Sequence, residues 1–348
     1  MKKLLKLSCL ALLAISVVGC GKKAQVPEKT VAAAYVDIEK AYANGKDLCE
    51  VFIDALPKEM REGAKKEYEG AIKTIDENKK LLNPQWAVAA IGGTFKELAN
   101  AGGETLAVAV RVSTSEEDFT KLLKDNGFGV EPKKEKDGLV FPLGTMQLGL
   151  INGKYLIFGL SEDSFKTMFD LYAGNGKSSD DFGELARISG NTIARLSTAP
   201  ISRLLERFEL QKEIENFGKI TEDEDIADMV LGMGAISLDV KLDDDDIGLI
   251  LRVVCDSSGD AKIVDHFFQA ITFCARAFFD GAAYAAEKDV SLPIPMLSKS
   301  MQKEIAQAKL GLIAAARSIE AERDSNIAQL SFVLDIDDLT KMVKESFK

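Results

Sequence analysis

The sequence predicts an α+β protein made of two related units, each an antiparallel sheet with helices packed on one face. Three observations support this prediction. Short apolar runs of strand length are separated by turn residues, longer segments have helical periodicity, and two stretches of the chain resemble each other. The composition, with 46% apolar and 28% charged residues, is typical of a packed globular protein.

The first unit is predicted to occupy residues 30–175. Strands are expected at residues 31–38, 86–91, 105–112, 139–141, 146–151 and 155–159, with Asn152-Gly153 as a hairpin turn between the last two. A short helix is expected to follow the first strand through Leu56, and Pro57 is expected to open a second, charged helix. Two further helices should begin at Ser115, in a capping box with Asp118, and at Ser161.

The second unit, residues 190–348, repeats this order. Strands are expected at residues 192–197, 233–242, 247–254 and 327–334, and helices after Pro200, at residues 260–287 and 298–318, and from Asp337. The stretch 108–115 resembles 250–257, and 155–169 resembles 328–343, in the order strand, cap and helix. We therefore expect an internal duplication, and superposition of the two halves tests it.

The N-terminus has the features of an export signal. Lys2 and Lys3 give a positive start, and an uncharged, mostly apolar run from Leu7 to Val18 follows. This run is shorter than the roughly 20 residues that span a bilayer. It ends in Val17-Val18-Gly19-Cys20, which resembles the lipobox of bacterial lipoproteins. The resemblance implies cleavage between Gly19 and Cys20 and acylation of Cys20.

The predicted organisation is therefore a signal peptide at residues 1–19, a lipidated tether at 20–29 and the two units. Ten tether residues reach about 33 Å at most, so we expect the protein to remain close to the membrane. The tether begins with Gly21 instead of the aspartate that retains some lipoproteins at the inner membrane. This favours the periplasmic face of the outer membrane in a two-membrane cell, and otherwise the outer face of the cytoplasmic membrane.

The overall pattern resembles uncharacterised exported lipoprotein families with duplicated strand-pair-and-helix units behind a lipobox. These families have no assigned chemistry, so the resemblance implies no site residues. The mature chain is acidic. Cleavage removes three lysines, which leaves 41 Lys+Arg against 55 Asp+Glu and a net charge near −14. We therefore expect no nucleic-acid partner.

Three cysteines, Cys49, Cys255 and Cys274, follow the tether in apolar surroundings. We expect buried thiols. One disulfide is the alternative in an oxidising compartment, and the sequence does not indicate which pair would form it.

No catalytic, metal or cofactor site is predicted. His266 is the only histidine and lies on an apolar helix, which excludes a metal site built of several histidines. The run 174–178 ends like a phosphate loop but has Leu171 in place of its first glycine, and 300–303 fits S-x-x-K without partner motifs. The acidic run 243–246 does not continue as a calcium loop and is interpreted as a solvated hairpin turn.

The helix at 260–287 carries aromatic residues on more than one face. Such a helix is usually buried, but Phe268 and Phe279 are a possible apolar surface for a lipid or a partner. We expect a non-enzymatic, membrane-anchored envelope protein that binds another envelope component or has a structural role. The alternatives are a lipoprotein that binds a small molecule or lipid in a cleft between the halves, and a carboxylate-based hydrolase.

Overall fold

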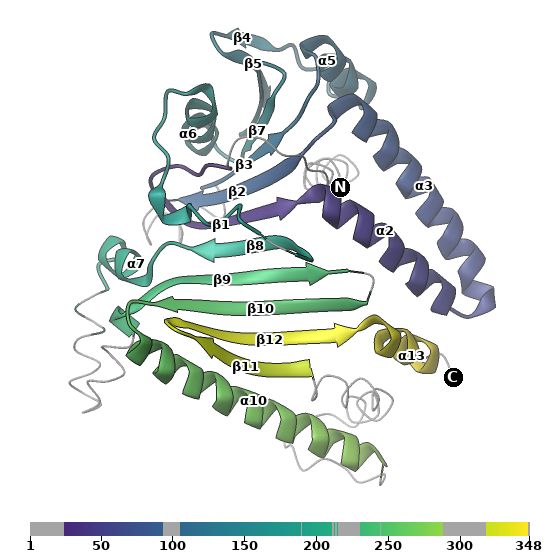
Figure 1. The fold of residues 1–348 in the computed structure, drawn as a ribbon. Helices are drawn as coiled ribbons and strands as arrows, with labels where there is room; N and C mark the ends of the chain where they lie inside the picture. Colours follow the sequence, from purple (N-terminus) through teal and green to yellow (C-terminus); the bar gives the residue numbers. More distant parts are fainter. Residues whose placement is uncertain are drawn as a thin grey trace. The chain divides into compact units, whose positions relative to one another are not determined.

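A computed structural model describes residues 24–92, 105–188, 190–210, 212, 214, 230–243, 245–287 and 318–346. The described residues are helices and antiparallel strands, so the α+β prediction is confirmed (Figure 1). They form two compact units: Met1–Ala43 with Gly70–Leu231, and Asn44–Glu69 with Gly232–Lys348.

The first unit contains an antiparallel sheet with the strand order β8-β1-β2-β3-β7-β6-β5-β4. The strands are β1 (Thr30–Asp37), β2 (Trp86–Gly92), β3 (Leu106–Arg111), β4 (Lys133–Glu135), β5 (Gly138–Leu143), β6 (Met146–Ile151), β7 (Tyr155–Gly159) and β8 (Thr192–Thr198). Asn152 and Gly153 both have positive φ, 50° and 67°, as expected for the two-residue turn between β6 and β7.

Helices cover both faces of this sheet, whereas the sequence led us to expect one covered face. Helix α6 (Glu162–Ala173) buries Phe165 and Met168 against the face that carries Trp86 and Val88. Helix α5 (Glu116–Asp125) buries Phe119 against the opposite face. Successive strand residues point to opposite faces, and both sets are apolar here, so each face needs its own helix.

The helical hairpin that follows β1 consists of α2 (Ile38–Ala55) and α3 (Lys58–Leu82), and its residues divide between the two units. In the first unit the Tyr42 hydroxyl donates to the Asp76 carboxylate at 2.7 Å. In the second unit the Asn44 side chain donates to the Leu242 carbonyl. The first contact joins α2 to α3 within the hairpin, and the second joins α2 to the end of β9.

The second unit has the strand order β11-β12-β10-β9, and all pairs are antiparallel. Its elements are β9 (Met233–Leu242), β10 (Asp246–Cys255), α10 (Ser258–Glu287), β11 (Ile319–Asp324), β12 (Ile327–Asp335) and α13 (Ile336–Ser346). Helix α7 (Ile201–Arg207) and the short 3₁₀ helix η1 (Asp180–Phe182) belong to the first unit. Most of the predicted helix at 298–318 lies outside the described residues.

The order of elements recurs along the chain. A strand and a helical segment are followed by a strand pair and a helix, first from β1 to α5 and again from β8 to α10. Further strands and a last helix follow in each case: the four strands β4 to β7 with α6 in the first half, and the two strands β11 and β12 with α13 in the second. Within each half, the two strands that belong to the repeated stretches pair with each other: β3 with β7 in the first half, and β10 with β12 in the second. The recurrence starts at β1 and β8, but the compact units divide later, at Leu231, because β8 pairs with β1.

Candidate functional site

The first ten residues of α10 form the same core contact as all of α5. The Ser115 hydroxyl accepts from the Asp118 N–H at 3.0 Å, and the Ser257 hydroxyl accepts from the Asp260 N–H at 3.1 Å. Counted from these serines, the buried positions are the same in both helices: Phe119, Leu122 and Leu123 in α5, and Ala261, Val264 and Asp265 in α10. Ten residues therefore suffice for the contact shared with α5. The rest of α10, which we call its extension, still buries Phe268 and Thr272.

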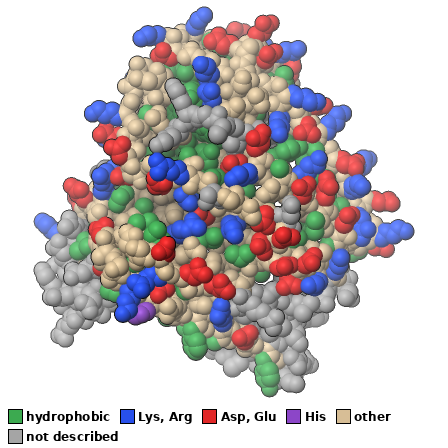
Figure 2. Space-filling model, in the orientation of Figure 1, with side chains coloured by type: hydrophobic (Ala, Val, Ile, Leu, Met, Phe, Trp, Pro, Cys, Tyr) green, Lys and Arg blue, Asp and Glu red, His purple; other side chains and the backbone are tan. Residues whose placement is uncertain are grey.

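The outward side of α10 is apolar and exposed. We name this the apolar face of α10 and define it by Ile263, Phe267, Ile271, Phe273 and Tyr284. Phe267, Phe273 and Tyr284 are 62%, 74% and 64% exposed. Figure 2 shows hydrophobic side chains projecting at the lower edge of the view, where α10 lies in Figure 1. Clustered exposed aromatic side chains of this kind mark contact surfaces more often than scattered ones do.

This face differs from the one that the sequence suggested. Phe268 is 4% exposed and is buried like Val264, so its interpretation as a contact residue is wrong. The side chain of Phe279 lies outside the described residues. Phe267 and Phe268 are adjacent, but one residue turns a helix by about 100°. One of the two therefore faces the sheet and the other faces away from it.

A groove of about 690 Å³ lies between the extension of α10 and strand β11. Its lining residues are Gln269, Thr272, Phe273, Arg276, Ala277, Asp280, Glu320, Ala321 and Glu322. The Arg276 guanidinium donates to the Ile319 carbonyl and ties the helix to the strand. The Thr272 hydroxyl is buried and has no hydrogen-bond partner among the described residues. Such a groove has the size of a small-molecule site.

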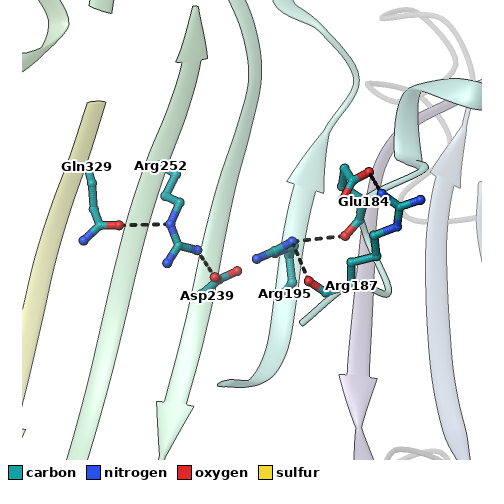
Figure 3. Close-up of polar contacts among 6 residues, drawn as sticks. All are labelled: Glu184, Arg187, Arg195, Asp239, Arg252 and Gln329. Atoms are coloured by element: carbon teal, nitrogen blue, oxygen red, sulfur yellow. Dashed lines mark hydrogen bonds and ion pairs between the residues drawn. The ribbon is translucent and has the colours of Figure 1, made fainter. Parts of the chain in front are cut away.

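Charged side chains of the second unit form a polar row on its sheet (Figure 3). Arg252 on β10 makes an ion pair with Asp239 on β9, and its Nε donates to the Gln329 side chain on β12 at 3.0 Å. Asp239 is only 1% exposed, so the arginine neutralises a buried carboxylate. In the first unit Arg187 pairs with Glu184, and Arg195 donates to the Glu184 carbonyl at 3.0 Å. These contacts have structural roles.

The remaining candidate residues fall outside any assembled site. Among the described residues, no group of three His, Cys, Asp or Glu side chains could hold a metal ion. The Asp243 carboxylate accepts from the N–H groups of Asp245 and Asp246, at 3.0 and 2.6 Å, and so closes the turn between β9 and β10. Burial and the Asp243 charge raise the pKa of Asp246. His266 is exposed on α10.

Two of the three cysteines do not follow the prediction that all are buried. Cys255 is 1% exposed, but Cys49 and Cys274 are exposed, and all three are free thiols. Gly19 and Cys20 lie outside the described residues, as does the run 300–303. Within the described part of the chain, no helix has the length and apolar character needed to cross a bilayer.

Comparisons with known proteins give a distant structural likeness. No family model and no curated protein matches the chain. Three crystal forms of TP0453 resemble the chain, with TM-scores of 0.40 for form I, 0.42 for form III and 0.41 for form IV. Their sequence identity is 9–10%, and the matches cover 92–94% of this chain and 97–100% of TP0453.

Proposed function

We propose that this chain is a lipid-anchored, non-enzymatic envelope protein that binds another envelope protein through the apolar face of α10. The anchor is the lipid on Cys20, as the lipobox resemblance implies. Two or three acyl chains hold a protein stably on a membrane. The location is the periplasmic face of the outer membrane in a two-membrane cell, or the outer face of the cytoplasmic membrane otherwise.

The observation that supports binding is the apolar face of α10 itself. Three of its five residues, Ile271, Phe273 and Tyr284, lie on the extension of α10, beyond the ten residues whose core contact matches that of α5. Truncation of Phe267, Phe273 or Tyr284 should cost little stability because these side chains are mostly exposed, and evolution could replace them with polar residues cheaply. Exposed aromatic side chains at such positions resemble the anchors at the centres of protein interfaces.

Site-specific photo-crosslinking in cells tests this proposal. A photoreactive phenylalanine analogue replaces Phe267 or Phe273 in the intact lipidated protein, and Met60, exposed on α3, is the control position. We expect one adduct of the same mass at both α10 positions and none at Met60. The double variant Phe267→Ser, Phe273→Ser should lose the partner while the melting temperature is kept. Equal crosslinking at Met60, or no adduct on α10, would contradict the proposal.

A small molecule bound in the α10–β11 groove is the second candidate function. It is favoured by the groove volume and by the polar side chains Gln269, Arg276 and Glu320 in its lining. The sequence had suggested a cleft between the two halves, whereas this groove lies inside the second unit. Native mass spectrometry of the purified chain would show a bound small molecule, and Ala277→Trp should displace it by filling the groove.

A further inference from the structure

The segment that leads to the proposed lipid attachment site is fastened to the first unit from Gln25 onward. The Tyr172 hydroxyl donates to the Gln25 carbonyl at 2.9 Å and accepts from the Gln25 N–H at 3.0 Å. The Val26 carbonyl accepts from the Ser179 N–H at 2.8 Å, and the Glu28 N–H donates to the Lys177 carbonyl at 3.2 Å. Four backbone hydrogen bonds thus hold residues 25–28 beside the end of α6.

This attachment is buried as well as hydrogen-bonded. Val26 is 1% exposed and belongs to the core beside α6. The Tyr172 ring packs against Trp86 and Tyr155, with ring centroids 6.1 and 4.8 Å apart. Burial raises the pKa of the Tyr172 hydroxyl, so it stays protonated and able to donate at any ordinary pH. Release of residues 25–28 would therefore expose core surface and leave polar groups unpaired.

The fixed segment shortens the lipid tether. Ten residues from Cys20 to Lys29 would reach about 33 Å, but only five residue steps separate Cys20 from Gln25, which is about 16–18 Å at most. We propose that the surface of the first unit around Gln25, formed by the end of α6 and the loop 174–177, lies against the lipid headgroups. This inference rests on the lipidation of Cys20 in the proposed function.

The partner of this surface is the headgroup layer of the leaflet that holds the acyl chains. A headgroup region is about 5–8 Å thick, so part of the tether length is used before the chain leaves the membrane. The loop presents exposed Asn175 and Lys177, and Lys22 and Lys23 lie within the tether. These lysines would partly offset the repulsion between an acidic protein and anionic lipids.

Short-range fluorescence quenching by headgroup-labelled lipids tests this orientation. The lipidated protein, with Cys49→Ser and Cys274→Ser, receives one dye at Asn175→Cys or at Asp163→Cys and is placed in phosphatidylethanolamine–phosphatidylglycerol liposomes. The two dyes lie near opposite ends of α6, roughly 18 Å apart along the helix. We expect at least about twofold stronger quenching at position 175. Insertion of about twenty Gly/Ser residues before Ala24, with a typical span near 27 Å, should abolish this difference.

Equal or stronger quenching at position 163, or quenching at 175 that survives the insertion, would overturn the inference. The mass of the N-terminal peptide is measured on the same sample. A peptide without acyl chains would refute the anchor, and the orientation with it. An acylated peptide with the wrong quenching pattern would refute the orientation alone. Tyr172→Phe keeps the ring but loses both hydrogen bonds to Gln25. Because Val26 and Glu28 keep their hydrogen bonds, the tether gains only about one residue, and we expect the 175-to-163 quenching ratio to stay above one.

Discussion

Replacement of Asp265 by leucine should stabilise the second unit. Asp265 is 7% exposed on α10, and its Oδ1 has no hydrogen-bond partner, while Oδ2 accepts from Gln269 at 2.9 Å. The same position of α5 holds the buried Leu123. Removal of an unsatisfied buried oxygen recovers about 1–3 kcal/mol, and burial of a leucine adds about 1.5–3 kcal/mol. Loss of the Gln269 contact costs little, because the exposed amide can bind water.

The net expectation is a gain of about 2 kcal/mol in the free energy of unfolding, since the larger side chain also needs room. For a unit of this size, that gain corresponds to a rise of about 4–8 °C in the melting temperature. Urea unfolding followed by circular dichroism measures the gain, and an unchanged m-value shows that the midpoint alone moved. Leu123→Asp is the matched control and should destabilise the first unit. A destabilised Asp265→Leu variant would show that the carboxylate has a partner that the structure lacks.

Three further predictions follow from buried or crowded polar groups. Asp239→Ala should lower the free energy of unfolding by about 3 kcal/mol in urea titrations, because it leaves Arg252 partly buried without its carboxylate; Asp239→Asn should cost less. Burial and the nearby Asp260 charge raise the pKa of Cys255, so Ellman's reagent should modify it only after unfolding, whereas the two exposed thiols react at once. The raised pKa of Asp246 means that the folded state binds its proton more tightly than the unfolded state. Asp246→Asn should therefore raise the melting temperature at pH 7, and this advantage should disappear below about pH 3.8.

The local structure of the first unit could be predicted from its sequence because short-range signals agree with the fold. The serine cap at Ser115, the helix start at Ser161 and the Asn152-Gly153 turn are confirmed by their hydrogen bonds and backbone angles. Strand β11 was missed because Glu320, Glu322, Arg323 and Asp324 make its sequence mostly charged. Charge is common on a strand at the edge of a sheet, where it discourages pairing with other chains, but it hides the alternation that identifies a strand.

The candidate site was only partly predictable. The aromatic content of the helix at 260–287 indicated a contact surface, but the sequence could not show which side faces the sheet. Phe267 and Phe268 are equally apolar neighbours, and the sheet alone decides that Phe268 is buried. The groove was also beyond prediction, because it depends on where β11 lies beside α10. Both features arise from contacts between segments that are distant in sequence.

The Tyr172–Gln25 attachment also bears on how the protein could be shed from a membrane. Proteases cut backbone that is accessible and free of hydrogen bonds. From Gln25 onward the chain is bonded to Tyr172, Lys177 and Ser179. If Cys20 carries the proposed lipid, only residues 21–24 would separate it from protected backbone, and a protease would have to reach them beside the bilayer. Shedding of the intact ectodomain would require a protease that works at the membrane surface, or prior opening of the first unit around α6.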